Sequence, residues 1–179
     1  MLTFSLKTEE IPIIVIAPSK QAQSISTVGS SVTVFTEEDL ENSTEIFLQD
    51  VINYGAPGMT VYQSGGAGTQ SGVQLRGLPK RYSTVYIDGV KMSDPSSSDN
   101  SFYFSNIMNS SIKNVEVLRG SQTSMYGSGA IGGAINIYTK DGEDKSLNKL
   151  VISRGSNNAK NLDVSYGEAY NNHSYYLGL

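Results

Sequence analysis

A short glycine-rich run has the most specific chemical meaning in this sequence. Gly127, Gly129 and Gly132 fit the spacing G-x-G-x-x-G of a dinucleotide-binding loop. Such a loop must open a helix, because the helix N-terminus faces the pyrophosphate. Here the glycines run into residues 134–139, Ala-Ile-Asn-Ile-Tyr-Thr, whose alternation and β-branching predict a strand. The sequence therefore argues against a nucleotide site and against a nucleotide-dependent enzyme.

Other residues that could do chemistry are sparse. His173 is the single His, and it lies in a strand-like run without an acidic neighbour. The absence of Cys excludes disulfides, thiolate metal sites and cysteine nucleophiles. Asp94 and Asp99 lack the full ligand spacing of a calcium loop. We therefore predict no catalytic residue, no metal and no cofactor, and a protein that is not an enzyme.

The composition favours β-structure and turns. The 179 residues include 18 Gly and 11 Tyr, and only 38% are hydrophobic. A net charge of -4 gives no support for nucleic-acid binding. No apolar run approaches the roughly 20 residues of a membrane-spanning helix.

The elements that must position any site are short. Alternation and turn residues predict strands, and Thr36 followed by acidic residues predicts a helix start. Asp88-Gly89 supplies the positive φ values of a tight hairpin. Strands are expected at 31–35, 59–62, 73–77, 84–87, 90–92, 114–118 and 134–139, helices after Thr36 and at 44–53, a helical turn at 104–109, and loops at 63–72 and 94–101.

The two ends of the chain differ from its middle. For residues 1–30 the sequence predicts a mobile segment with one apolar patch. This patch could pair as an added strand with the edge of a partner's sheet, or the segment could remain a disordered tail. Residues 147–154, 159–168 and 173–179 alternate as successive antiparallel strands. Because the chain stops inside the last run, and residues 1–6 lack a complete signal peptide, we expect a piece of a longer protein with an internal or artificial start.

Residues 112–140 resemble the end of the plug domain of TonB-dependent outer-membrane receptors. In that family a strand, Arg-Gly, a short helix, a Tyr-Gly turn and an Ile-Asn-Ile strand follow in this order, as they do here. Three more blocks match the plug of this family, in the order expected along the chain. They are residues 32–40, residues 48–61 with Pro57-Gly58, and residues 73–95 with Arg76-Gly77 and Asp88-Gly89. Many members have Pro where Ser121 follows Arg119-Gly120.

The resemblance implies a fold and a division into parts. The expected fold is an α/β (α+β) plug with a small mixed sheet and short helices, followed by the start of an antiparallel transmembrane β-barrel. The expected parts are a flexible segment at 1–30, the plug at 31–141 and the first barrel strands at 147–179. Without the rest of a barrel we expect those strands to be frayed or mispaired.

The resemblance also implies partners and site residues. The receptor would lie in the outer membrane with its N-terminus in the periplasm, and it would import a nutrient complex with energy from TonB, ExbB and ExbD. Arg76 and Arg119 would face carboxylates of the barrel wall. The TonB contact would be Ile13, Ile14, Val15, Ile16 and Ala17, with Ile16 in place of the family's Thr. The substrate-contacting loops would contribute Gly68, Thr69, Gln70, Ser71, Met92, Ser93, Asp94, Asp99 and Asn100.

The substrate is predicted from the composition of these loops. Residues 63–77 look most like those of cobalamin receptors. The loops are rich in short polar residues and Gly, which suits a large amide-rich ligand, whereas a ferric siderophore would benefit from several cations or aromatic rings. Cobalamin is therefore favoured, and the alternatives are a ferric-siderophore receptor and a stand-alone periplasmic binding module.

Overall fold

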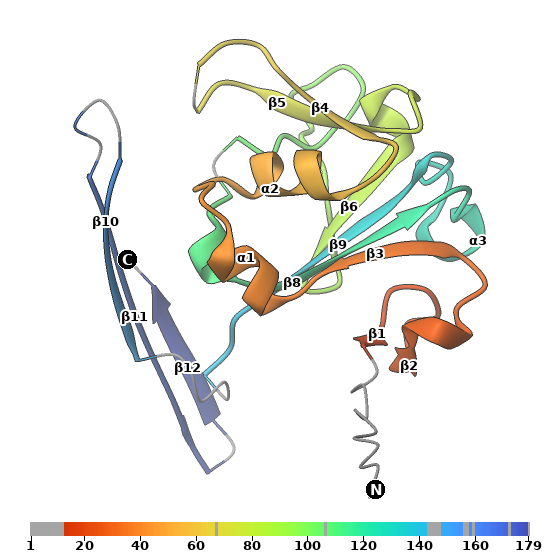
Figure 1. The fold of residues 1–179 in the computed structure, drawn as a ribbon. Coiled ribbons are helices and arrows are strands. Elements are labelled where there is room, and N and C mark those ends of the chain that lie inside the picture. The colour runs from red at the N-terminus through yellow and green to blue at the C-terminus, as the bar shows by residue number, and fades with distance from the viewer. Residues whose placement is uncertain are drawn as a thin grey trace, which may run out of the picture.

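The computed structural model places a compact plug beside a separate sheet of three long strands (Figure 1). It describes residues 13–66, 68–105, 107–142, 148–155, 158, 160–171 and 173–178. The sequence-based predictions for residues 1–6 and for residue 147 lie outside these ranges. Within them, no helix has both the length and the apolar character that a membrane span requires.

A five-stranded mixed sheet forms the centre of the plug, as expected. Its strands are β3 (Ser31–Phe35), β8 (Ile112–Arg119), β9 (Gly133–Thr139), β6 (Ser83–Ile87) and β7 (Val90–Met92), in this order. Only β6 and β9 run parallel. The β6–β7 hairpin turns at Asp88 and Gly89, whose φ angles of +48° and +80° match the predicted tight turn.

One face of this sheet packs against helices α1 (Glu37–Asn42) and α2 (Leu48–Gly55). Helix α1 begins with a capping box, in which Thr36 accepts from the Asp39 amide and Asp39 accepts from the Thr36 amide. Helix α2 buries one stripe of side chains, and the largest of them are Leu48 and Ile52. On strands β8 and β9 the core between helices and sheet is built from β-branched side chains at alternate positions, namely Val115, Val117, Ile135 and Ile137.

Two local predictions were wrong in detail. Helix α2 begins at Leu48 rather than Thr44, because Phe47 forms an antiparallel bridge with Met108 and the Leu48 amide donates to the Ile107 carbonyl. The helical turn predicted at 104–109 is present only in part: the Ile107 amide donates to the Phe104 carbonyl at 3.2 Å, but the 3-10 turn η3 begins at Asn109 and spans Asn109–Ser111. Residue 106 lies outside the described ranges. Two further 3-10 turns of the same length, η1 and η2, occupy Ile25–Thr27 and Lys80–Tyr82.

A hairpin of β4 (Met59–Gln63) and β5 (Ser71–Leu75) lies above α2 (Figure 1). The predicted loop at 63–72 is therefore shorter than expected, because Gln63, Ser71 and Gly72 belong to paired strands. Ser71 is fully buried.

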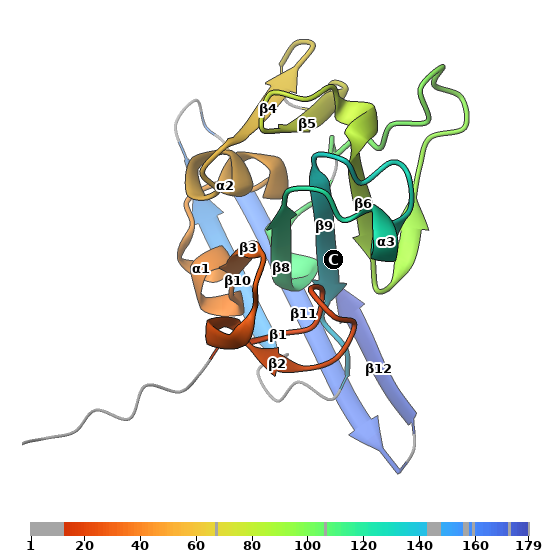
Figure 2. The same ribbon diagram turned by 90° about the vertical axis from the view of Figure 1, so that its right-hand side faces the viewer.

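The opposite face of the central sheet is covered by the N-terminal segment and helix α3 (Thr123–Tyr126). Strands β1 (Ile14–Val15) and β2 (Gln23–Ser24) form a small hairpin at the lower end of β8 and β9 (Figure 2). Residues 13–30 thus fold onto the plug in this structure, and the mobility expected for residues 1–30 stays a prediction. Val15 and Ala17 are almost completely buried there.

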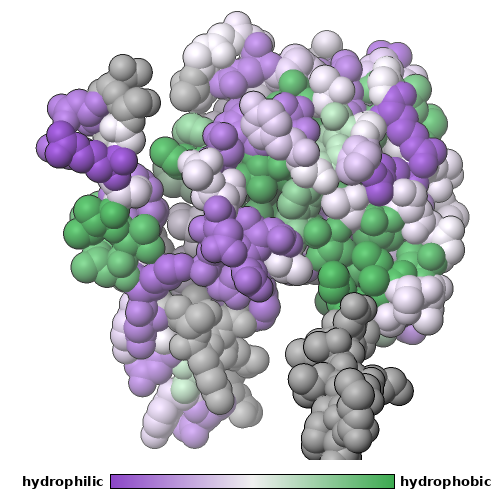
Figure 3. All heavy atoms as spheres, viewed as in Figure 1, coloured by the Kyte–Doolittle hydropathy of each residue, from purple (hydrophilic) through white to green (hydrophobic). Residues whose placement is uncertain are grey.

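Strands β10 (Lys149–Arg154), β11 (Lys160–Tyr170) and β12 (His173–Gly178) form an antiparallel sheet with continuous register. The prediction of frayed or mispaired strands is contradicted for these residues. One face carries exposed apolar side chains, visible as the hydrophobic band in Figure 3. These side chains are Leu150, Ile152, Leu162, Val164, Tyr166, Tyr175 and Leu177.

Candidate functional site

The N-terminal segment is attached to the plug through its main chain. The Ile16 amide donates to both oxygens of Glu116, at 3.0 Å and 3.1 Å, and the Ala17 amide donates to one of them at 2.7 Å. The Tyr126 hydroxyl donates to the Ala17 carbonyl. Val15 points its side chain into the plug. These contacts hold residues 14–17 in one position. The hydrogen bonds among them use main-chain amide and carbonyl groups of the segment, which almost any sequence would provide.

The outer side of the same segment is apolar. Ile13, Ile14 and Ile16 expose 45%, 51% and 41% of their surfaces. Figure 3 shows a hydrophobic area beside the point where the described chain begins. Exposed isoleucines on a short strand suit contact with another protein surface better than contact with water. The five residues predicted as the TonB contact therefore lie in one docked segment, of which Ile14 and Val15 form strand β1.

The carboxyl group that holds the segment is itself buried. Glu116 stands at the centre of β8, between Val34 on β3 and Asn136 on β9. Burial raises the pKa of Glu116, while the amides of Ile16 and Ala17 act in the opposite direction. Sequence reasoning missed Glu116, because a glutamate in the run Val-Glu-Val reads as the polar side of a half-exposed strand.

The predicted substrate loops lie at the other end of the plug, far from β1 (Figure 1). Gly68, Thr69 and Gln70 are exposed between β4 and β5. The loop after β7 exposes Ser93 and Asn100 and half-buries Met92, Asp94 and Asp99. Ser71 is the exception, because its burial in β5 removes it from any contact surface.

A cation and an aromatic ring meet beside these loops. The Lys80 ammonium donates to the Tyr103 hydroxyl at 2.7 Å and lies 4.3 Å from the centre of the Tyr103 ring. Asp99 is 3.7 Å from the same ammonium. The contact of Lys80 with Tyr103 joins the turn η2 to a loop residue 23 positions away, so no local sequence signal predicts it. This cluster gives the loop face one cationic, aromatic position.

The glycine-rich run has a packing role. Helix α3 ends at Tyr126, so its C-terminal end, not an N-terminus, meets Gly127. At Gly133 a Cβ would stand 2.1 Å from the Leu118 carbonyl oxygen, and at Gly132 one would stand 3.2 Å from the Tyr82 carbonyl oxygen. These glycines allow the start of β9 to approach its neighbours closely. The rejection of a dinucleotide loop agrees with this geometry.

Among the described residues, the two arginines predicted to face the barrel wall make no hydrogen bond or ion pair with β10–β12. Arg119 donates to the Pro57 carbonyl at 2.7 Å, within the plug. Arg76 is exposed, has a φ of +54° and donates its amide to the Gly58 carbonyl. Among the described residues neither guanidinium has a carboxylate partner. Their contact with wall carboxylates stays a prediction.

The contact between plug and long strands is instead ionic. Lys140, at the end of β9, lies 2.8 Å from Glu37 and 3.0 Å from Glu41 on α1, and Lys149 of β10 lies 2.8 Å from Glu41. Burial opposes the charge of Lys140, yet the two carboxylates together raise its pKa. No sequence signal predicts this cluster, because its members are about 100 residues apart.

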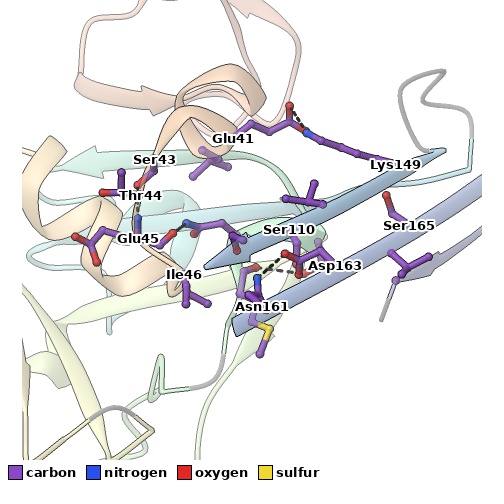
Figure 4. Close-up of a pocket in the computed structure, with 18 of the residues that line it drawn as sticks. Glu41, Ser43, Thr44, Glu45, Ile46, Ser110, Lys149, Asn161, Asp163 and Ser165 are labelled. Atoms are coloured by element: carbon purple, nitrogen blue, oxygen red, sulfur yellow. Dashed lines mark hydrogen bonds and ion pairs between the residues drawn. The ribbon is translucent and has the colours of Figure 1, made fainter. Parts of the chain in front are cut away.

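A pocket of about 640 Å³, lined by both apolar and polar side chains, lies between the plug and the long strands beside this cluster (Figure 4). On the strand side its lining includes the polar residues Lys149, Asn161, Asp163 and Ser165, together with Val151 and Val164. On the plug side it is lined by α1 and the loop at 43–46. The strands thus present a mainly polar face to the plug and an apolar face outward, which is the alternation typical of an outer-membrane barrel wall.

Comparison with known proteins agrees with these features. Residues 24–134 match the family model described as TonB-dependent Receptor Plug Domain. The chain is 30% identical over 159 residues to the vitamin B12 transporter BtuB of Vibrio vulnificus, covering 89% of this chain and 26% of that protein.

Two solved structures share the fold. The ferripyoverdine receptor of the outer membrane of Pseudomonas aeruginosa has a TM-score of 0.68 at 16% identity, with 90% of this chain and 21% of that one covered. The alcaligin outer-membrane receptor FauA of Bordetella pertussis has a TM-score of 0.65 at 22% identity, with 87% and 26% covered. The chain thus spans about a quarter or less of the length of these relatives. The mixed sheet, the docked N-terminal strand and the family match together show that the chain belongs to the TonB-dependent receptor plug domain family.

Proposed function

We propose that this chain is the plug and the first wall strands of an outer-membrane receptor that imports a nutrient complex with energy supplied through TonB. The observation that carries the proposal is the separation of two surfaces. An apolar strand lies at one end of a folded plug, and exposed polar loops lie at the other (Figure 1). A plug that links a partner on one side of a membrane to a ligand on the other needs this arrangement. The family is one of transport receptors, and no enzymatic step is proposed.

Each part of the chain has its own role in this proposal. Residues 1–30 would carry the TonB contact at residues 13–17, and ExbB and ExbD would energise TonB from the inner membrane. Residues 31–141 would fill the lumen, and residues 147–179 would begin a barrel wall whose apolar face meets lipid. The apolar outward face supports the wall assignment over a stand-alone periplasmic module, because Leu150 and Ile152 are 65% and 76% exposed. Arg76 and Arg119 would meet carboxylates on other parts of the wall.

The proposed substrate is cobalamin. The similarity to a vitamin B12 transporter supports it, as do the short polar side chains and glycines of the loops. The contacts would come from Gly68, Thr69, Gln70, Met92, Ser93, Asp94, Asp99 and Asn100. A ferric siderophore is the second candidate, and it is favoured by the cluster of Lys80 and Tyr103, which suits an anionic or aromatic chelate.

Uptake and surface binding, measured on the same cells, test the coupling. Val15→Pro removes an amide donor and prevents strand pairing, so uptake should be lost while binding stays near normal. Val15→Ala keeps the amide and serves as the control. Normal uptake by the Pro variant would mean that the TonB contact lies elsewhere. The two substrates are distinguished by separate uptake assays with cobalamin and with iron chelates, and uptake of the chelate alone would reverse their order.

A further inference from the structure

The outward face of the three long strands carries a carboxylate at one edge of its apolar band. Alternate positions of β11 share this face, and in chain order they are Lys160, Leu162, Val164, Tyr166, Glu168 and Tyr170. Eight residues of strand span about 26 Å, or about 20 Å along the membrane normal at the usual tilt of barrel strands. An apolar band of outer-membrane barrels is about 25 Å tall. Glu168 therefore stands at the boundary of the band and not in its middle.

Two tyrosines on the same face hold the Glu168 carboxylate. The hydroxyls of Tyr166 and Tyr175 both donate to Oε2 of Glu168, each at 2.7 Å. Tyr175 is also the cross-strand partner of Glu168, and its ring centre lies 6.3 Å from that of Tyr166. An ionised carboxylate only accepts hydrogen bonds, so two hydroxyl donors on one oxygen suit the charged form and fix its orientation.

The other carboxylate oxygen is open. Among the described residues no donor contacts Oε1 of Glu168, and no cation forms an ion pair with this residue. Glu168 is exposed, and Tyr166 and Tyr175 beside it expose 45% and 51% of their surfaces. A charge next to an apolar face is costly unless a counter-charge or a hydrogen-bond donor reaches it. The open oxygen thus suits a cation that carries N–H groups and approaches along the outward face.

We propose that Glu168, with Tyr166 and Tyr175, binds the headgroup of a phospholipid that ends in a primary ammonium, as in phosphatidylethanolamine. The inference rests on the proposed function, because it requires β10–β12 to face lipid. The ammonium would donate to Oε1, and the acyl chains would lie along Val164 and Leu177, which are exposed in the adjoining part of the band. A bound headgroup would fix the height of these wall strands at the membrane interface.

The geometry favours an ammonium with N–H groups over a quaternary one. A choline headgroup has the same charge but no N–H donor, so it would contact the faces of aromatic rings rather than the carboxylate oxygen. Here the two tyrosine hydroxyls point to Glu168, and the open acceptor is Oε1. Ethanolamine and choline lipids with identical acyl chains are therefore a matched pair of probes.

Quenching by brominated lipids measures which lipid lies beside the site. The full-length receptor, in nanodiscs, would carry a bimane fluorophore on a single cysteine at Leu177→Cys, because Leu177 pairs with Tyr166 next to Glu168. One series of discs mixes brominated phosphatidylethanolamine with plain phosphatidylcholine, and a second series exchanges the bromine label. We expect the ethanolamine lipid to be preferred about tenfold, which corresponds to one charge-assisted hydrogen bond.

Three variants test which side chains give this preference. Glu168→Gln should lower it below twofold, because the charge is lost. Tyr175→Phe keeps the carboxylate but removes one of the donors that orient it, and should lower the preference about threefold. Asp163→Asn removes the same charge from the same strand on the side that lines the pocket, and should leave the preference unchanged. If Glu168→Gln fails to insert, the two lipid series in the wild-type receptor still decide.

Equal quenching by the two lipids in the wild-type receptor, or a preference that survives Glu168→Gln, would overturn the proposal. A preference for the choline lipid would overturn it too, because the rings alone would then form the site. These results leave the proposed function untouched. Absence of quenching by either lipid would mean that β12 does not face lipid, which would contradict the wall assignment on which this inference rests.

Discussion

Replacing Gly133 with Ala should damage the plug more than any other glycine substitution near the central sheet. Gly133 opens β9, has a φ of +151° and pairs with Arg119 of β8. A Cβ built there lies 2.1 Å from the Leu118 carbonyl oxygen and 2.8 Å from a methyl group of Leu75. The methyl group can rotate away, but the carbonyl oxygen belongs to the paired strand. The strands must therefore separate.

The size of the effect follows from these distances. Moving the two atoms from 2.1 Å to the 3.0 Å that real Cβ contacts require takes about 0.9 Å. The same movement would lengthen the neighbouring hydrogen bond from the Gly120 amide to the Gly132 carbonyl from 3.0 Å to about 3.9 Å, which is outside hydrogen-bonding range. Loss of one or two buried backbone hydrogen bonds, together with the unfavourable φ, costs about 2–5 kcal/mol. That is a large share of the stability of an ordinary domain.

The assay is resistance of the plug to trypsin in isolated outer membranes, normalised to the amount of receptor present. Gly133→Ala should be cut rapidly. Gly58→Ala, with a φ of +74° but open space around it, should show a small loss of about 1–2 kcal/mol. Gly29→Ala, with open space and no positive φ, should behave as wild type. If Gly133→Ala were as resistant as Gly29→Ala, the packing role of the glycine-rich run would be refuted.

Three further predictions concern single side chains. The pKa of Glu41 is lowered, first by its hydrogen bond with Lys149, so the stability that this carboxylate contributes is present above its ordinary pKa and is lost as the pH falls through the lowered value. Thermal unfolding of the receptor, measured between pH 7 and pH 3, should therefore show that Glu41→Gln loses less stability on acidification than the wild type does. Asp88→Ala should lower the free energy of unfolding by about 1–3 kcal/mol in the same assay, because Asp88 accepts two hydrogen bonds from Thr139 and has a positive φ that Ala tolerates poorly. Asp88→Asn should lower it less. Lys80→Gln should weaken binding of an anionic ferric chelate about tenfold and binding of cobalamin less than twofold, measured as binding to whole cells.

Local patterns predicted much of the fold. The strand at 31–35, the capped helix after Thr36 and the Asp88-Gly89 hairpin depend on neighbouring residues, and each lies where the pattern placed it. The start of α2 was missed, because Phe47 is drawn out of the helix by Met108, which lies about 60 residues away. The regular sheet of β10–β12 was also not expected, although its alternation was read correctly.

The candidate site was less predictable for the same reason. The five residues of the N-terminal strand could be chosen from an apolar run and a resemblance. Their docking could not, because it depends on Glu116, a residue 100 positions away in the middle of a strand. Burial of Glu116 arises only when both faces of the sheet are covered. A glutamate between Val115 and Val117 is the single local signal, and it is shared by many half-exposed strands.

Cross-linking in living cells tests the central claim most directly. A receptor with Ile14→Cys would be expressed together with TonB carrying single cysteines, and disulfide formation would be followed with and without added substrate. We predict a cross-link at position 14 that increases when cobalamin is added and decreases in the Val15→Pro variant. A cross-link that never forms at positions 13–16, in a receptor that still transports, would contradict the assignment of this strand as the TonB contact.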